Sequence, residues 1–415
     1  MTTERPLKNP LHRTRQPLLP PGARSRKAHL LTAAAAEGRF ALPRCGACGT
    51  YAWPMPEACP NCLSADMTAA KAPPGAVLLS DTRAEGPADP YFRERAPWRV
   101  GLAQMDCGPV ALVHLHPEPQ AGDRLKLTLM LDRAGQAVLH AGPENGGDMR
   151  SDKQWQEMVA DPKGRRVLIT DARHVAALPL ARKLAASGAA AIFMGLPEGW
   201  KPLENRADFE AVPGLRFVAL DLASDRSVED LARDIGGKVE ILINTADHPR
   251  PGGLLAPAAA IHARASMEAV AFGLMRLARS FGPALAGRGA DGGADAPGAV
   301  AWVNVLSVFA RATPSEMAGY AAAHAAALSL SHSLRAQLGG GGVRLMTVLT
   351  GPTEDDWFQL APQPKVTGKA LADAVVAGLM RGLEEVVVGD VARDLMARLA
   401  ENPKAVERDL SQGKL

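Results

Sequence analysis

The residues best suited to chemistry are four cysteines, which form two CxxC pairs with a ten-residue spacer between them. They are Cys45, Cys48, Cys59 and Cys62. Each CxxC can form a tight turn that directs two thiolates at one ion, and two such turns supply the four sulfur ligands of tetrahedral zinc. Four protein ligands leave no open position for water. We therefore predict a structural Zn2+ site that contributes folding free energy to a segment too short to build its own core.

Two other uses of these cysteines are a redox-active CxxC and a pair of disulfides. The doubled motif and an expected cytoplasmic location favour zinc over both, because disulfides are rare in the cytoplasm. The remaining cysteine, Cys107, stands alone in the sequence and is expected to be a small buried core residue.

The elements that position this site belong to a chain of 415 residues, which is long enough for two or three domains. Hydrophobic residues make up 47% of it and aromatic residues 4%, so the cores must consist mainly of Ala, Val and Leu, and a wholly disordered chain is excluded. No apolar run approaches the roughly 20 residues that span a bilayer, and the N-terminus lacks the apolar core of a secretory signal. We expect a cytoplasmic protein without membrane association.

The net charge of +3 is distributed unevenly along the chain. Residues 1–30 hold seven Lys or Arg and one Glu, so the remainder of the chain is slightly acidic. A basic, proline-rich arm at 1–25 is expected to be a disordered or surface-bound tail, and the alternative is a strap that binds an acidic partner subunit. Nucleic-acid binding is disfavoured because the remainder of the chain is not basic.

A period-two apolar pattern follows the cysteines. Within 123–132, four leucines alternate with Lys126, Thr128 and Met130, which indicates a strand with one buried face. Five short strands are expected, at 75–82, 98–105, 109–116, 123–132 and 136–141. Five short strands with Gly and Pro between them indicate a small closed barrel such as an OB-fold. Its use for nucleic acid would need aromatic platforms interleaved with Lys and Arg, and only Tyr91, Phe92 and Trp98 lie here.

Residues 26–140 resemble an acyl-CoA-associated family that has an N-terminal helix, a rubredoxin-like zinc ribbon and an OB-fold. The segment RKAHLLTAAAAEGRFALPRCGACGTYAWPMPEACPNC, followed by GAVLLSDTRAEGP and AGDRLKLTL, carries the resemblance. Members of that family are similar to non-catalytic partners of thiolases, of hydroxymethylglutaryl-CoA synthase and of steroid side-chain retro-aldolases. The resemblance implies a thiolase-like partner, with acyl-CoA at the interface between the two proteins.

The expected domains are the arm at 1–25, helix and ribbon at 26–64, an OB-fold at 65–142, a linker at 143–163, an α/β domain at 164–402 and a tail at 403–415. In the α/β domain, apolar runs alternate with helical stretches, which is typical of a parallel sheet covered on both faces. The runs lie at 165–170, 189–194, 216–221, 239–244, 299–306, 343–349 and 384–389. The fold class is α/β plus small β, with a doubly wound Rossmann-like sheet after the barrel. The stretch 287–298 is expected to be a long flexible loop.

Residues 163–402 resemble the short-chain dehydrogenase/reductase family. Within VNVLSVFARATPSEMAGYAAAHAAALSLSHSLRAQL, Ser307 and Tyr320 stand thirteen residues apart, as the catalytic Ser and Tyr of that family do. Asp221, which closes VALD, matches the acid that the family places near the adenine of its cofactor.

The phosphate-binding pattern of that family is altered here. Its TGxxxGxG begins with Thr170, but the three glycine positions hold Asp171, Val175 and Ala177. Glycines are needed there because the chain turns tightly and its backbone must approach the pyrophosphate at a helix N-terminus. Asp171 would also place a negative charge beside the phosphate. We therefore expect that NAD(P) does not bind.

The catalytic set is altered as well. The resemblance implies a Lys four residues after the Tyr, which lowers the pKa of the Tyr and binds the nicotinamide ribose, and that position holds His324. An imidazole is shorter and mostly neutral at pH 7. The Asn of the preceding helix corresponds to Met267, and the family's NNAG becomes Asn244, Thr245, Ala246 and Asp247. Ser307, Tyr320 and His324 are thus expected to be a degenerate set, the alternative being a remodelled site for another reaction.

The leading hypothesis is a non-catalytic zinc-binding subunit of a thiolase-type acyl-CoA-processing complex, with a pseudo-dehydrogenase domain used for assembly. The alternative is an active NAD(P)-dependent 3-hydroxyacyl-CoA dehydrogenase that works with a thiolase. Nucleic-acid binding through the OB-fold and the arm is a third hypothesis. The helix expected at 318–338 is rich in alanine, which permits close helix packing, and we expect a homodimer through the Rossmann-like domain.

Overall fold

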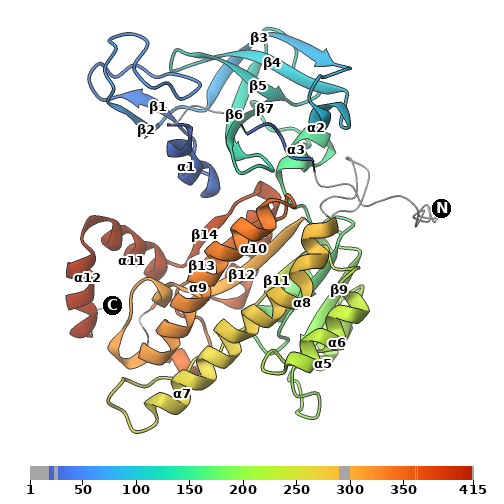
Figure 1. The fold of residues 1–415 in the computed structure, drawn as a ribbon, viewed down its shortest axis with the longest axis vertical. Coiled ribbons are helices and arrows are strands. Elements are labelled where there is room, and N and C mark those ends of the chain that lie inside the picture. The colour runs from blue at the N-terminus through green and yellow to red at the C-terminus, as the bar shows by residue number, and fades with distance from the viewer. Residues whose placement is uncertain (1–17, 23–26, 289–299, 360, 362, 414–415) are drawn as a thin grey trace, which may run out of the picture.

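The computed structural model describes residues 18–22, 27–288, 300–359, 361 and 363–413. Most of the predicted basic arm and of the predicted loop at 287–298 therefore lies outside the described residues. The ribbon and barrel form one part of the molecule, and a larger α/β domain forms the other (Figure 1). Within the described residues, no helix is both long enough and apolar enough to cross a membrane.

The N-terminal part begins with a helical turn, η1 (Ala28–Leu31), and a short helix, α1 (Thr32–Ala36). Strands β1 (Ala41–Cys45) and β2 (Met67–Lys71) pair antiparallel and hold the cysteine loops between them. The ribbon thus extends beyond the predicted boundary at residue 64, because β2 is its second strand. Leu31 and Leu42 are buried in the same hydrophobic cluster as the barrel leucines, so ribbon and barrel share one core.

The barrel confirms the predicted five strands. They are β3 (Gly75–Ala84), β4 (Trp98–Met105), β5 (Val110–Leu115), β6 (Arg124–Leu131) and β7 (Ala137–Pro143), with α2 (Pro90–Arg93) between β3 and β4. The closed order is β3-β4-β5-β7-β6, and β5 and β7 pair in parallel. Leu125, Leu127 and Leu129 are at most 2% exposed, as the alternation in the sequence predicts.

The predicted linker at 143–163 is not an extended connection. It contains a helical turn, η2 (Met149–Ser151), and a helix, α3 (Lys153–Met158). Glu157 of α3 is buried and accepts ion pairs from Arg95 at 2.9 Å and from Arg133 at 3.0 Å. Buried ion pairs hold this short segment against the barrel, together with Met158 and Val159, which pack in one apolar cluster with Trp98.

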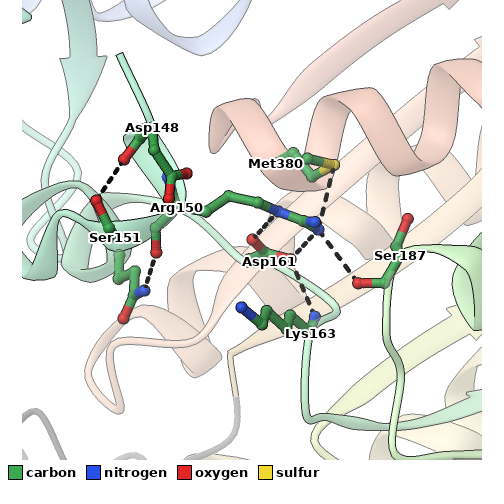
Figure 2. Close-up of polar contacts among 8 residues, drawn as sticks. Asp148, Arg150, Ser151, Asp161, Lys163, Ser187 and Met380 are labelled. Atoms are coloured by element: carbon green, nitrogen blue, oxygen red, sulfur yellow. Dashed lines mark hydrogen bonds and ion pairs between the residues drawn. The ribbon is translucent and has the colours of Figure 1, made fainter.

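The same segment is also bonded to the α/β domain. Figure 2 shows the Arg150 guanidinium extending from η2, with two hydrogen bonds of 2.8 Å to the Asp161 carboxylate. It also donates to the backbone oxygen of Ser187, at 3.2 Å. Elsewhere, Arg344 of the α/β domain donates to the backbone oxygen of Leu131 at 2.9 Å. The bonds from Arg150 to Ser187 and from Arg344 to Leu131 join the two parts of the molecule.

The α/β domain contains the predicted seven-stranded parallel sheet, in the order β10-β9-β8-β11-β12-β13-β14. The strands are β8 (Arg166–Ile169), β9 (Ala191–Leu196), β10 (Leu215–Ala219), β11 (Ile241–Asn244), β12 (Ala301–Ser307), β13 (Arg344–Thr350) and β14 (Glu385–Val388). The order reverses between β8 and β11, which is the switch point where such folds bind ligands. Each strand matches a continuous apolar run because helices cover both faces of the sheet.

One face of the sheet carries α4 (Ala177–Ala186) and α10 (Gly368–Arg381), and the other carries α6 (Asp225–Ile235), α8 (Gly273–Arg288) and α9 (Ala318–Gly339). The remaining helices are α5 (Arg206–Glu210), α7 (Ala259–Ser266), α11 (Asp390–Glu401) and α12 (Pro403–Ser411). Shorter turns are η3 (Met267–Phe272), which is π-helical, η4 (Val308–Ala310), η5 (Ser315–Met317) and η6 (Asp356–Phe358).

Residues 403–411 of the predicted tail form helix α12, which lies beside α11 at one edge of the domain (Figure 1). Asn402 caps the helix by accepting the backbone N–H of Ala405, and Pro403 occupies its first turn. Val406 and Leu410 are buried in one cluster with Leu395 of α11. The α/β domain therefore continues past residue 402.

Candidate functional sites

The four cysteines converge on one point at the tip of the ribbon. Their sulfur atoms all lie within 4.8 Å of one another. The sulfur atoms of Cys45 and Cys62, and those of Cys48 and Cys59, are each 3.6 Å apart. A tetrahedron with zinc–sulfur bonds of about 2.3 Å has sulfur–sulfur edges of about 3.8 Å. The donor set and its spacing therefore fit a Zn2+ ion held by four thiolates, as the doubled CxxC motif predicts.

Two matching turns create this geometry. In the first, the Gly49 N–H donates to the Cys45 oxygen at 2.9 Å, and in the second the Leu63 N–H donates to the Cys59 oxygen at 2.9 Å. Gly49 and Leu63 both have positive φ, 74° and 62°. Only glycine adopts this conformation without steric cost, so the second turn carries backbone strain at an exposed leucine. The Asn61 N–H also donates to the Cys59 sulfur, at 3.4 Å.

The sulfur cluster favours a bound cation electrostatically. Hydrogen bonds from Thr50 lower the pKa of Cys48 to about 5, so this group is a thiolate at neutral pH. A hydrogen bond from the Ser64 backbone lowers the pKa of Cys62, but the three neighbouring cysteines, Cys48 foremost, and partial burial together outweigh it and raise that pKa to about 12. Adjacent negative sulfurs thus oppose further ionisation, and a divalent cation would remove this opposition because it stabilises every thiolate it binds.

A second group of polar residues gathers at the carboxyl ends of the central strands of the sheet. Thr170 follows β8, Asn244 ends β11 and Ser307 ends β12, while Tyr320 and His324 lie in the first two turns of α9. All five are buried. Folding therefore brings together the residues that sequence resemblance placed in the degenerate site.

Asp221 lies apart from this group. It follows β10, is exposed, and its carboxylate accepts the N–H of Ala223 at 2.9 Å. Met267 begins the π-helical turn η3 and packs partly buried against the helices on that face. Asn244 is used structurally, since its Oδ1 accepts from the Thr170 hydroxyl at 3.1 Å and its Nδ2 donates to Asn304 at 3.3 Å.

The turn between β8 and α4 bonds its own backbone N–H groups. The Asp171 carboxylate accepts the Arg173 N–H at 2.8 Å, and the His174 Nδ1 accepts the Ala176 N–H at 3.1 Å. The Ala177 N–H donates to the His174 oxygen at 2.8 Å. Burial raises the pKa of Asp171 and lowers that of His174. Three N–H groups near the start of α4 are therefore engaged within the turn.

Both ring nitrogens of His324 are also engaged. Its Nδ1 accepts the backbone N–H of Ser307 at 3.1 Å. Because a backbone N–H can only donate, Nδ1 carries no proton, and the neutral ring must carry its proton on Nε2. That Nε2 lies 3.2 Å from the Asp247 carboxylate. His324 therefore has no free nitrogen with which to accept or donate a further proton.

Asp247 also faces Tyr320, whose hydroxyl donates to it at 3.4 Å. Burial, followed by the charge of Asp247, raises the pKa of Tyr320 well above its usual value. Burial raises the pKa of Asp247 itself, but the hydrogen bonds from His324 and Tyr320 and the electrostatic effect of the neighbouring histidines together outweigh burial and hold that pKa below its usual value. The site therefore contains an ionised carboxylate beside a fully protonated tyrosine.

Sequence reasoning noted Asp247 as a departure from NNAG but did not pair it with His324. A signal for the pairing was present, because a carboxylate replaces glycine in the same chain in which histidine replaces lysine. Their separation of 77 residues hides the contact from any local pattern.

Comparisons with known proteins match both parts of the chain. The short chain dehydrogenase family profile matches residues 165–364, and that of the ChsH2 rubredoxin-like zinc ribbon domain matches residues 32–68. A crystal structure of a short chain dehydrogenase from Burkholderia cenocepacia J2315 in complex with NADP is 30% identical and covers 60% of this chain and 99% of its own, with a TM-score of 0.52.

Two curated relatives are also similar, the short-chain dehydrogenases ptmH of Penicillium ochrochloron and PC-15 of Penicillium crustosum. Each is 29% identical over 153 residues, which is 35% of this chain. The chain spans about half the length of these relatives, 51% in each case.

Proposed function

Because the chain belongs to the short-chain dehydrogenase family and carries a ChsH2-type zinc ribbon ahead of that domain, we propose that it is a non-catalytic, zinc-binding subunit of a thiolase-type acyl-CoA-processing complex. The carrying observation is the contact between Asp247 and His324. His324 puts a neutral imidazole where the family has its lysine, and Asp247 places a carboxylate against the hydroxyl of Tyr320. The dehydrogenase-like domain then serves assembly.

Loss of oxidoreductase chemistry follows from the protonation states in this site. A catalytic tyrosine must release its proton near neutral pH, and a nearby cation favours that release. Tyr320 has the opposite surroundings, because burial and the Asp247 carboxylate both disfavour a phenolate. Ser307 and Tyr320 are, in this proposal, scaffold residues inherited from an active ancestor.

Weak or absent binding of NAD(P) follows from the first turn of the domain. A pyrophosphate needs free backbone N–H groups at a helix N-terminus. The N–H groups of Arg173, Ala176 and Ala177 already have acceptors within the turn. A nucleotide would have to break these bonds, and it would meet the Asp171 carboxylate beside its phosphates.

The assembly role draws on the ribbon and on the surface of the α/β domain. The zinc-ribbon match supports a partner of the thiolase type, with acyl-CoA held at the interface. On the helices α7, η3 and α8, the large apolar residues Ile261, Phe272 and Met275 are 70%, 44% and 49% exposed. Exposed apolar side chains along these consecutive helices favour a protein contact there, and we propose that a second copy of the chain covers them.

The test is a fluorescence titration of the purified chain with NADH and NADPH up to about 1 mM, alongside capture of a tagged chain from its native host. We expect no saturable cofactor signal and a thiolase-type protein in the captured complex. A saturable signal would instead favour an active NAD(P)-dependent 3-hydroxyacyl-CoA dehydrogenase. That alternative has one observation on its side, since the similar Burkholderia protein was crystallised with NADP.

A further inference from the structure

A cavity of about 440 Å3 lies against the outer surface of the barrel, on the β4 and β5 side. Its wall is made by Pro20 and Pro21, by Trp53 and Pro54 of the ribbon, by α2, by several barrel strands and by the end of α3. A cavity of this volume suits a small molecule, since ligand pockets usually measure roughly 300–1,000 Å3.

The wall is apolar because its polar groups are bonded within the protein. The Trp98 indole N–H donates to His114 Nδ1 at 3.0 Å, and the Tyr91 hydroxyl donates to Glu157 at 3.1 Å. The Asp132 carboxylate accepts two backbone N–H groups, each at 2.9 Å. What remains exposed to the cavity is mainly hydrocarbon and aromatic ring.

The aromatic rings are packed together rather than displayed for stacking. Phe92 and Trp98 meet edge to face, with ring centroids 5.1 Å apart, and Trp98 is only 5% exposed. Among the described residues that line the cavity there is no lysine or arginine. A single-stranded nucleic acid needs both exposed stacking platforms and cations, so this wall does not suit it.

The position of the cavity on the barrel is the place where OB-folds commonly bind ligands, the face of their second and third strands. In this chain those strands are β4 and β5, whose outward residues include Val100, Leu102, Val110 and Leu112. Leu112 is 64% exposed, and Val110 is 41% exposed. The face on which OB-folds commonly bind ligands is therefore apolar in this chain.

We propose that this cavity binds an uncharged apolar organic group, such as a fused ring or a branched hydrocarbon. A peptide segment would suit the cavity less well, because its backbone groups need hydrogen-bond partners that the wall does not offer. The inference goes beyond the proposed subunit role and does not depend on it, since residues of this chain alone line the cavity.

The experiment titrates the full-length zinc-loaded chain with N-phenyl-1-naphthylamine, an uncharged probe that fluoresces in apolar surroundings. We expect a saturable rise with one probe per chain. Leu112→Asp, which places a charge at the rim of the cavity, should weaken binding at least tenfold. Leu79→Asp is the matched control, because Leu79 is 47% exposed on β3 of the same barrel and does not line the cavity.

A second variant fills the cavity instead of charging its rim. Val100→Trp should reduce the number of bound probes per folded chain, with the zinc content and thermal unfolding midpoint measured on the same samples. A linear, non-saturable signal, or equal losses in Leu112→Asp and Leu79→Asp, would overturn the proposal. Displacement of the probe by a single-stranded oligonucleotide would overturn it too, in favour of a nucleic-acid site.

Discussion

The carboxylate of Asp247 lies 3.2 Å from Nε2 of His324. By the resemblance to short-chain dehydrogenases, these two residues stand where that family places glycine and lysine, and each replacement accounts for the other. Without Asp247, the buried Nε2–H of His324 would have no acceptor. Without His324, the Asp247 carboxylate would lose the hydrogen bond that this N–H donates. The two residues therefore form one structural unit, in which an acid and an imidazole satisfy each other's hydrogen-bonding groups.

Replacement of Asp247 should destabilise the domain. In Asp247→Ala, the His324 Nε2–H and the Tyr320 hydroxyl lose their acceptor, and the free energy of unfolding should fall by about 2–3 kcal/mol. Asp247→Asn keeps an acceptor and should cost less. Denaturant unfolding of the single variants and of the Asp247→Ala, His324→Ala double variant measures the coupling, for which we expect at least about 1 kcal/mol. Additive effects would contradict a shared unit.

Restoring the family's residues at these two positions should not restore cofactor binding. In the double variant Asp247→Gly, His324→Lys, the N–H groups of Arg173 and Ala176 remain bonded to Asp171 and His174. Titration with NADPH should therefore still give no saturable fluorescence change. If this variant binds NADPH while the natural chain does not, the block lies at the Asp247 contact and not in the first turn.

Zinc content should depend on the four ribbon cysteines and not on Cys107. We expect one zinc per chain by elemental analysis, with Cys59→Ser losing most of it, because the sulfur of the fully buried Cys59 belongs to the cluster of four. Cys107→Ser is the matched control and should keep full zinc, since Cys107 does not belong to the cluster. Equal zinc content in both variants would contradict the assignment of the four ribbon cysteines as the zinc ligands.

Replacement of Leu63 by glycine should stabilise the second zinc-binding turn. This residue is 80% exposed and has φ 62°, so Leu63→Gly removes steric strain without removing a core contact. We expect a gain of about 0.5–1 kcal/mol in stability. Gly49→Ala makes the opposite change in the first turn, where φ is 74°, and should lose a similar amount. Thermal unfolding of the zinc-loaded proteins compares the two, and a destabilised Leu63→Gly would mean that the leucine makes a contact of its own.

Stability should decline as the pH falls from about 7 toward 5, in part through His174. Burial lowers the pKa of this histidine below its ordinary value of 6.5, so between the lowered pKa and 6.5 the unfolded chain binds more protons than the folded one. Protonation therefore favours unfolding in that window, and the stabilisation is fully present above it.

The matched variant for this effect is His174→Asn, whose side-chain oxygen can still accept the Ala176 N–H but cannot titrate. Its unfolding free energy should vary less between pH 5 and 7 than that of the natural chain. Equal slopes in the two proteins would mean that His174 titrates alike in the folded and unfolded states.

Features encoded within a single short segment were determined by the sequence itself. The spacing of Cys45, Cys48, Cys59 and Cys62 specifies a four-sulfur site because each CxxC is closed by its own local turn. The seven strands of the α/β sheet were recognisable because a strand covered on both faces must be apolar along its whole length. The alternating leucines of β6 predicted one buried face for the same kind of reason.

Only the tertiary structure decided what distant polar residues do. Asp247 reaches His324 across 77 residues of chain, and Glu157 of α3 joins Arg95 and Arg133 in a segment that the sequence presented as a linker. The cavity beside Trp98 likewise has a wall made of segments that lie far apart in the sequence. Apolar periodicity records which face of an element is buried, but a buried ion pair or a shared wall depends on which elements pack together, and that is set by the fold as a whole.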